Sequence, residues 1–483
     1  MESGRTSSEE LVRQYLERIA AFDDAGPALN AMLYLNPRAL DDARALDRER
    51  AEQGSRGPLH GIPVVLKDNY DTLDMPTTAG AVAMADFVPP DDGQQVRRLR
   101  EAGAVFIGKT NLHEFARGIE TVSSLGGQTR NPYDPRRNPG GSSGGTAAAV
   151  TASFAAVGMG SDTCGSIRIP AAANNLFGLR VTQGLSSTDG IVPLSHTQDV
   201  AGPLARSMLD LATVLDATVG PTGHVPDSFV GLLQPAALEG ARLGLLTDYL
   251  RTAAPYGDVS KVVRETAAKM ADAGAEVVEI TIDGLDDLLR NSSVIDYEFT
   301  TDVEAYLRAS NAPVGSIPEL LDSGQYHEAL DGRYRRSVAR AGEADEYQAR
   351  LERRKLIHDL LVETMTTHDL DALAYPALRV RPAFIGEPQH GSLCRISAHS
   401  GLPAISLPAG FTRDGLPVGI ELLAGPFDDG RLVAFGYAWE QLAKPRSAPR
   451  RTPSLVTDVL SLEFELDGPG LAGKLRLDRP TQL

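Results

Sequence analysis

The sequence predicts an α/β fold, in which one large mixed, mostly parallel twisted sheet is covered by helices on both faces. In the first half of the chain, a strand-like apolar run at Pro58–Leu66 precedes a helical pattern at Val96–Ala102 and a second run at Ala104–Ile107. In the second half, runs at Leu243–Thr247 and Val277–Ile282 flank an amphipathic helical pattern. Such repeated strand–helix–strand units are typical of a sheet with helix cover.

Length and composition fit one large domain or two to three ordinary ones. The chain has 483 residues, of which 42% are hydrophobic, enough to form a sizeable core. Its 47 basic and 64 acidic side chains give a net charge of −17. Overall charge therefore disfavours binding to nucleic acids or anionic membranes, and we expect neither as a partner.

The chain has two cysteines, Cys164 and Cys394, and neither has the spacing of a metal ligand. We therefore expect no disulfide framework and a reducing compartment. Residues 1–5 lack the apolar core of a signal peptide, and there is no run of ~20 apolar residues to span a membrane. The expected location is the cytoplasm, although removal of a leader would leave the same N-terminus.

Local patterns predict the other elements along the chain. A capping box at Thr6 or Ser7 begins a helix that continues to Phe22, and Pro37 opens a second helix. The charged region at 285–366 is expected to be mostly helical and to shape the entrance to a site. Further elements are a helix at Ser207–Val219, strands at Ala372–Pro376, Ala404–Pro408 and Val418–Leu423, and a last helix at Arg431–Leu442.

The predicted domain organisation is one domain at 1–450, with its core at 58–220, and a C-terminal extension at 451–483. In the extension, Val459–Leu466 and Leu471–Leu477 alternate in polarity around Asp467-Gly468-Pro469-Gly470. A turn sequence between two alternating runs predicts a β-hairpin.

Two Gly/Ser loops are the most distinctive part of the sequence. The first reads Asn138-Pro139-Gly140-Gly141-Ser142-Ser143-Gly144-Gly145 and the second Gly160-Ser161-Asp162-Thr163-Cys164-Gly165-Ser166-Ile167-Arg168. Between them, Thr146–Phe154 predicts a buried helix and Ala155–Met159 a buried strand. Glycines let the backbone approach closely, and several N–H groups that point one way would bind a negatively charged oxygen.

Three chemistries could use such loops. A phosphate-binding P-loop needs a lysine after its last glycine, whereas Gly145 is followed by Thr146. The Gly-x-Ser-x-Gly elbow of α/β-hydrolases matches residues 140–144 but must follow a strand. The preceding segment contains Pro132, Pro135 and Pro139, which exclude a central strand. The third chemistry is a serine nucleophile activated by a group other than histidine.

The paired loops resemble the amidase signature family, whose members include fatty acid amide hydrolase, peptide amidase and the A-type subunit of the tRNA-dependent amidotransferase. Members also carry a lysine after a short apolar strand, as in Gly61-Ile62-Pro63-Val64-Val65-Leu66-Lys67. The resemblance runs from Thr6 to Ala443. It implies the amidase signature fold, with Ser166 as the nucleophile, Ser142 as a bridging serine on a cis peptide, and Lys67 as the base.

Lys67 can accept a proton only when it is neutral. Because burial disfavours the charged form, we expect the pKa of Lys67 to lie well below ~10.4.

An oxyanion site and supporting residues complete the predicted site. The backbone N–H groups of Thr163, Cys164, Gly165 and Ser166 are expected to stabilise the oxyanion. The loops are expected to be supported by Gly140, Gly141, Ser143, Asp162 and Arg168. Cys164 stands where family members more commonly have glycine. We interpret His196 and His399 as packing residues, and this mechanism requires no metal and no cofactor.

These features predict a hydrolase that cleaves the C–N bond of carboxylic amides through a serine acyl-enzyme, with small aryl or alkyl amides, esters or carbamates as substrate classes. The alternative is an A-type subunit of a tRNA-dependent amidotransferase that supplies ammonia from glutamine. Ile169 stands where such subunits usually have glutamine, which favours the free-standing hydrolase. A silent binding protein is disfavoured because Lys67, Ser142 and Ser166 are all present. The expected partner is a small-molecule amide, and a homodimer is left open.

Overall fold

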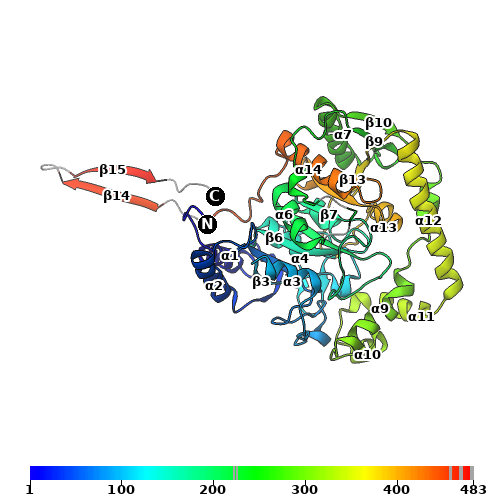
Figure 1. The fold of residues 1–483 in the computed structure, drawn as a ribbon, viewed down its shortest axis with the longest axis horizontal. Coiled ribbons are helices and arrows are strands. Elements are labelled where there is room, and N and C mark those ends of the chain that lie inside the picture. The colour runs from blue at the N-terminus through cyan, green and yellow to red at the C-terminus, as the bar shows by residue number, and fades with distance from the viewer. Residues whose placement is uncertain (221–222, 225–226, 456–458, 467–470, 479–483) are drawn as a thin grey trace.

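Eleven strands form one sheet through the centre of the molecule (Figure 1). The computed structural model covers residues 1–483 and describes all of them except 221–222, 225–226, 456–458, 467–470 and 479–483. The strand order across the sheet is β1-β3-β2-β6-β8-β7-β12-β13-β11-β9-β10. The bounds of these strands are β1 (Met32–Leu35), β2 (Pro63–Lys67), β3 (Val105–Thr110), β6 (Val157–Asp162), β7 (Phe177–Arg180), β8 (Val200–Ala205), β9 (Arg242–Leu246), β10 (Glu276–Ile280), β11 (Ala372–Pro376), β12 (Ala404–Phe411) and β13 (Pro417–Leu423).

The sheet is mixed, as predicted, but it is not mostly parallel. Parallel pairs join β2 to β3 and β6 near one edge, and β9 to β10 and β11 at the other. The six remaining pairs of this sheet are antiparallel. The prediction of mostly parallel pairing is therefore wrong. Sequence patterns located the strands, but strand direction depends on which strands become neighbours, and β12 and β13 are joined by a hairpin that reverses the chain.

Each strand contributes side chains to two cores, because successive residues point to opposite faces. In β2, Val64 and Leu66 belong to one cluster and Val65 to another. Both faces are buried, which explains the nearly continuous apolar runs in the sequence.

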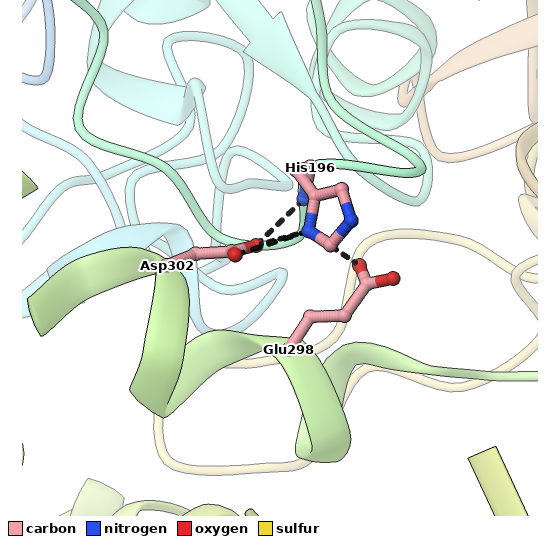
Figure 2. Close-up of side chains that lie close together, drawn as sticks. All are labelled: His196, Glu298 and Asp302. Atoms are coloured by element: carbon pink, nitrogen blue, oxygen red, sulfur yellow. Dashed lines mark hydrogen bonds and ion pairs between the residues drawn. The ribbon is translucent and has the colours of Figure 1, made fainter. Parts of the chain in front are cut away.

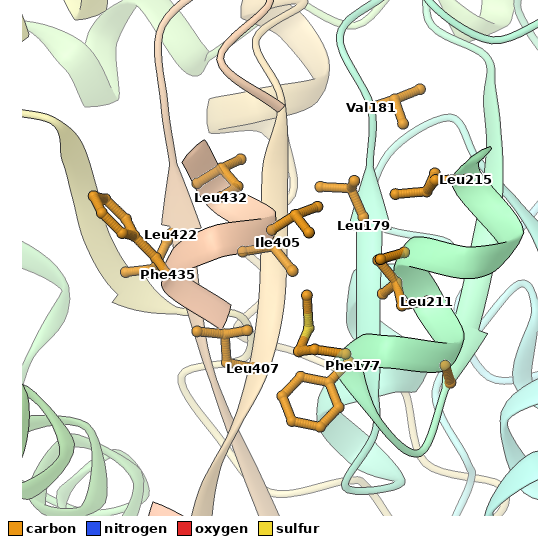
Figure 3. Packing of buried hydrophobic residues seen from close by; sticks show 14 of the residues in the cluster. Phe177, Leu179, Val181, Leu211, Leu215, Ile405, Leu407, Leu422, Leu432 and Phe435 are labelled. Atoms are coloured by element: carbon orange, nitrogen blue, oxygen red, sulfur yellow. The ribbon is translucent and has the colours of Figure 1, made fainter. Parts of the chain in front are cut away.

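One face of the sheet is covered by α3, α6, α7 and α14. Figure 3 shows part of this core, where Leu211 of α6 and Leu432 of α14 pack with Leu179 and Ile405 of the sheet. The bounds of these helices are α3 (Gln94–Glu101), α6 (Met208–Thr218), α7 (Gly257–Asp272) and α14 (Asp429–Ala443).

Among the described residues, seven helices cover the opposite face in two groups. All helices of the first group except the last pack near β2 and β3, the last one packs on β7, β12 and β13, and the second group packs near β9 and β11. The first group is α1 (Ser8–Phe22), α2 (Ala39–Gln53), α4 (Gly144–Thr151) and α5 (Arg168–Ala173), and the second is α8 (Leu285–Leu289), α12 (Ala344–Thr367) and α13 (Arg395–Ser400). In α1, the Ser7 side chain accepts a hydrogen bond from Glu10 N, so Ser7 is the N-cap. The second helix starts at Ala39, beyond the predicted Pro37.

A smaller helical lobe packs against loops at the edge of the sheet where β2 ends. It is made of α9 (Ile295–Ala309), α10 (Ile317–Ser323) and α11 (Asp331–Arg340). Phe299 and Tyr334 of the lobe pack with Phe115, which follows β3, and with Val192 and Leu194, which precede β8. The region predicted at 285–366 is thus helical, and its lobe lies against segments that adjoin the candidate site.

The remaining described elements are short or lie outside the main sheet. β14 (Val459–Leu466) and β15 (Leu471–Asp478) pair antiparallel where the sequence predicts a hairpin, while the predicted turn at 467–470 lies outside the described residues. The division into 1–450 and 451–483 stays a prediction. None of the helices in the described ranges is both long and apolar enough to cross a membrane. The short elements are β4 (Val122–Ser123), β5 (Gly127–Gln128) and the 3-10 turns η1 (Val82–Met84), η2 (Glu114–Ala116), η3 (Val230–Leu232), η4 (Thr247–Tyr249) and η5 (Glu328–Leu330).

Candidate active site

Lys67 is the last residue of β2, and its side chain is fully buried. Its Nζ donates to Ser142 Oγ at 2.7 Å and to Ser161 Oγ at 2.8 Å. Because β2 runs parallel to both β3 and β6, the carboxyl ends of the three strands meet at one edge of the sheet. This arrangement places Lys67 beside Ser161 and Asp162, the last two residues of β6, at the kind of edge where α/β sheets hold ligands.

Burial lowers the pKa of Lys67 from 10.5 to about 7, although the charges of Asp162 and Asp199 act in the opposite direction. The charged form loses its hydration inside the protein, and the two serine hydroxyls replace only part of it. Near neutral pH, roughly half of the molecules therefore hold Lys67 uncharged, which is the state that a proton acceptor needs. The predicted fall in the pKa of Lys67 is confirmed.

Ser142 lies in the first Gly/Ser loop, which leads into α4. The Gly141–Ser142 peptide is cis, and Gly140 has a φ of +76°, in the region that favours glycine. The Thr121 hydroxyl holds this loop, because it donates to Gly140 O at 2.7 Å and accepts from Gly144 N at 3.1 Å. A Cβ at position 141 would lie 2.8 Å from the carbonyl carbon of residue 119, so glycine is needed there.

Ser166 lies in the second loop, which is organised around Asp162. The Asp162 carboxylate accepts hydrogen bonds from Gly165 N at 2.7 Å and Ile167 N at 3.1 Å. The first of these contacts engages the Gly165 N–H group, one of the four predicted oxyanion donors. The structure therefore leaves the N–H groups of Thr163, Cys164 and Ser166 as the candidate donors.

Asp162 is also the centre of a buried charge cluster. Arg168 Nε lies 3.1 Å from Asp162 Oδ2, and the same guanidinium forms an ion pair with Glu421 of β13. Arg180, at the end of β7, lies 3.2 Å from Asp162 Oδ1. Burial raises the pKa of Asp162, but the two arginines outweigh it and hold that pKa below its ordinary value. Asp162 stays charged at neutral pH and fixes the start of the Ser166 loop.

The two serine loops are joined through Ser143. Its N–H group donates to Ser166 O at 3.2 Å, and its hydroxyl donates to Ser161 O at 3.2 Å. Among the described residues, Ser142 Oγ accepts a hydrogen bond from Lys67 Nζ, and no hydrogen bond joins the Ser142 and Ser166 hydroxyls. Catalytic contacts of this kind often shorten only when substrate binds.

Cys164 and Cys394 form a disulfide, with their Cα atoms 5.1 Å apart. This contradicts the expectation of no disulfide framework, and it removes the argument from cysteine usage for a reducing compartment. The two residues are separated by 230 positions in the sequence. They meet because the start of α13 lies against the Ser166 loop, a long-range contact that no local pattern reveals.

The two histidines noted in the sequence have contacts away from Lys67 and the two serines. His399 is buried, and its Nδ1 lies 2.7 Å from the Ser292 hydroxyl. His196 is exposed, and its Nδ1 lies 3.0 Å from Asp302 and 3.8 Å from Glu298 (Figure 2). Partial burial lowers the pKa of His196, but the two carboxylates raise it overall. These residue types also bind metals, yet here they form an ion pair that links α9 to the segment before β8.

Sequence reasoning missed several residues that shape this site. Ser161 is a direct partner of Lys67, and the Thr163 hydroxyl donates to Asp199 at 2.5 Å. Ser161 lies in the second Gly/Ser loop of the sequence, next to Asp162, and this position marks it as a candidate site residue. Arg180 and Glu421 come from distant strands and carry no such signal.

A small cavity of about 70 Å³ adjoins the site. Its polar wall includes Ser161 and Asn69, and Asn69 Nδ2 donates to Ser161 Oγ at 3.0 Å. Its apolar wall includes Ala116, Ile191 and Val192. The cavity could therefore hold a small group with one apolar side.

A mixed α/β sheet that delivers a buried lysine to two glycine–serine loops is the architecture of the amidase signature enzymes. The family model "Amidase" matches residues 10–433, and the chain belongs to this family. It is an enzyme of the amide-hydrolysing type, a hydrolase acting on C–N bonds.

The chain is similar both to free-standing amidases and to amidotransferase subunits. The solved peptide amidase from Stenotrophomonas maltophilia is 37% identical with a TM-score of 0.86, and the match covers 93% of this chain and 96% of that chain. The A-type subunit of glutamyl-tRNA(Gln) amidotransferase from Synechococcus sp. is 34% identical, over 94% of this chain and 96% of that protein. The solved A-type subunit from Thermotoga maritima is 27% identical with a TM-score of 0.69, over 90% and 91% of the two chains.

These relatives correct one expectation about partners. The acidic net charge led us to expect no nucleic-acid partner, yet curated relatives covering nearly the whole chain carry the name of a glutamyl-tRNA(Gln) amidotransferase subunit. That expectation is contradicted. Net charge describes the whole surface, whereas a protein of this family can join a tRNA-dependent enzyme as one of its subunits.

Proposed function

We propose that this chain hydrolyses carboxylic amides through an acyl-enzyme on Ser166, with Ser142 and Lys67 as the proton relay. The observation that carries the proposal is the contact between the fully buried Lys67 Nζ and Ser142 Oγ, at 2.7 Å. A lysine with a pKa of about 7 is poised to accept a proton near neutral pH.

In the first step, Ser166 Oγ attacks the amide carbonyl and its proton passes through Ser142 Oγ to neutral Lys67. The N–H groups of Thr163, Cys164 and Ser166 stabilise the oxyanion that forms. The proton then returns through Ser142 to the leaving nitrogen, which departs as an amine or ammonia. Water repeats the sequence on the acyl-enzyme and releases the acid.

The substrate class that we propose is a small aryl or alkyl amide, with esters and carbamates as further substrates. The small cavity of about 70 Å³ beside Ser161 has room for a compact substituent. The similarity to peptide amidase at 37% identity adds peptide amides to this class.

A second candidate is an A-type amidotransferase subunit that releases ammonia from glutamine. It is favoured by the curated relatives, of which one is 34% identical over 94% of this chain. Both candidates share the acyl-enzyme chemistry, so they differ in substrate and partner. The cytoplasmic location stays a prediction.

The test is to label the enzyme with a serine-directed phosphonate and locate the adduct by peptide mass mapping. We expect the adduct on Ser166, and Ser166→Ala should lose about six orders of magnitude in kcat. An adduct on Ser142, or an active Ser166→Ala variant, would overturn the assignment.

A substrate panel separates the two candidates. A free-standing hydrolase should cleave an anilide and a peptide amide without any added protein. An amidotransferase component should instead release ammonia chiefly from glutamine, and chiefly when co-purified with its partner chains.

A further inference from the structure

The Cys164–Cys394 disulfide joins the Ser166 loop to a distant segment of the chain. Cys164 is two residues before Ser166, and Cys394 is the N-cap residue of α13. No hydrogen bond in the described part of the chain involves the backbone N–H or carbonyl of Cys164. The disulfide is thus the bond that fixes this peptide against the rest of the protein.

The neighbouring residues of the loop have other supports. The Thr163 carbonyl accepts a hydrogen bond from Gln198 Nε2 at 3.1 Å, and its hydroxyl donates to Asp199. Gly165 N donates to Asp162. Polar contacts therefore hold both sides of Cys164 but not Cys164 itself, and its N–H group is free to face an oxyanion.

Cys394 is held in place by contacts with neighbouring residues. Arg168, which pairs with Asp162, also donates to Cys394 O at 3.2 Å. Ile396 of α13 packs with Ile357 and Leu361 of α12 in a buried cluster. The disulfide therefore anchors the Ser166 loop to a packed helix pair.

The segment before Cys394 reaches the other serine loop. We define residues 377–394 as the strap. The strap accepts a hydrogen bond from Arg137 at Pro382 O (2.6 Å), and Phe384 lies under the Arg137 guanidinium at 3.9 Å. Gln389 Oε1 accepts from Asn138 Nδ2 at 3.3 Å. The strap thus binds the Ser142 loop by hydrogen bonds and the Ser166 loop by the disulfide.

We propose that Cys394 is a positioning residue for the oxyanion loop, and that amide hydrolysis by this enzyme depends on the Cys164–Cys394 disulfide. The proposal rests on the proposed role of Ser166 and the loop N–H groups. A dithiol reductant would transfer two electrons and two protons to the bond, giving two thiols and a cyclic disulfide of the reagent. The Cys164 peptide would then lose its covalent anchor.

The expected effect follows from the cost of an oxyanion donor, about 100- to 1000-fold in rate when it is removed. A donor that is loosened but retained should cost less, about 10- to 100-fold in kcat. Because the oxyanion forms only in the transition state, KM should stay within about threefold. The midpoint of the pH–rate profile should not move, because the disulfide makes no contact with Lys67.

The experiment compares oxidised and dithiol-reduced wild-type enzyme on one anilide, with free thiols counted by a chromogenic reagent. We expect two thiols, a fall in kcat at steady KM, and recovery on reoxidation. Cys394→Ser should have the same low kcat before and after dithiol treatment, which excludes an effect of the reagent elsewhere. Circular dichroism checks that the variant is folded, and reversible reduction of the wild type carries the test if it is not.

Wild-type enzyme with two free thiols and kcat within twofold of the oxidised form would overturn the proposal. So would a folded Cys394→Ser variant with wild-type kcat. Phosphonate labelling separates this outcome from failure of the proposed function. If the adduct still maps to Ser166 while reduction has no effect, only the role of the disulfide is wrong.

Discussion

The pH dependence of amide hydrolysis tests the central feature of the site, a lysine that is neutral near pH 7. The pKa of Lys67 falls from 10.5 to about 7 through burial. Since one pKa unit corresponds to about 1.4 kcal/mol, burial and the opposing charges of Asp162 and Asp199 together favour the neutral form by roughly 5 kcal/mol. This is an effect on activity: the active, neutral form is lost as the pH falls through the pKa.

The rate should follow the neutral fraction of Lys67. With a pKa of about 7, roughly 1% of the molecules hold a neutral lysine at pH 5, half at pH 7 and nearly all at pH 9. We therefore expect kcat/KM on an uncharged anilide to rise about tenfold per pH unit below pH 7 and to level off above pH 8. An ordinary lysine would give a rise that continues beyond pH 9.

Two variants assign the profile to Lys67. Lys67→Arg keeps a positive charge and a long side chain but cannot become neutral, so it should be inactive on amides. Lys109 is the matched control, because it is also fully buried and its pKa is lowered by burial to about 8. It contacts Thr77, two backbone carbonyls and, at 3.8 Å, the Asp68 carboxylate, rather than the serine loops. A folded Lys109→Met variant should therefore keep the wild-type midpoint.

The proposed role of Lys67 is wrong if Lys67→Arg hydrolyses the anilide at the wild-type rate, or if the wild-type profile is flat between pH 5 and 9. This role is also wrong if the Lys109→Met variant shifts the midpoint of the pH–rate profile, because the profile would then report Lys109. Circular dichroism across the pH range serves as the control for unfolding.

Contacts elsewhere in the molecule can be tested by single changes. Glu421→Gln leaves the Arg168 guanidinium without a full counter-charge, so denaturant unfolding should show a loss of about 3 kcal/mol, and an unchanged midpoint would contradict this. Ser161→Ala removes one acceptor of Lys67 Nζ, and steady-state kinetics should show kcat on an anilide falling roughly tenfold, while no fall would assign Ser161 a packing role. A chain that ends at residue 455 should keep its kcat within twofold if the predicted boundary near 450 is right, as an activity assay would show. Treatment with a chelator should leave kcat unchanged, and inactivation would point instead to a metal at His196.

The sequence located the parts of the site that lie in continuous segments. Lys67 follows an apolar run, and both serines lie in glycine-rich loops with a buried strand between them. Parallel pairing of β2 with β6 then brings these segments together. The roles of these residues came from the resemblance to the amidase signature family, because β2 and β6 are adjacent in the sheet but Lys67 and Ser161 lie 94 residues apart in the sequence.

Several contacts that the sequence did not reveal link distant segments. Glu421 reaches Arg168 from β13, and Cys394 reaches Cys164 across 230 residues. The predicted direction of the central strands was wrong for the same reason, because apolar alternation identifies a strand but not the strand that pairs with it. A local contact was missed as well. The Gly165 N–H group, which we expected to face the oxyanion, donates instead to the Asp162 side chain.

The helical lobe of α9 to α11 contributes none of the groups proposed for catalysis, which makes the enzyme modular. It is attached to the sheet domain by a buried apolar cluster and by polar contacts such as Tyr306 to Asp71 at 2.7 Å, Tyr334 to Glu114 at 3.0 Å and the ion pair of Arg117 with Asp296. A lobe from another family member that retains these attachment residues could be grafted in its place. Such chimeras would change what reaches Ser166 while the buried lysine and both glycine–serine loops stay intact, so substrate range could be engineered without rebuilding the chemistry.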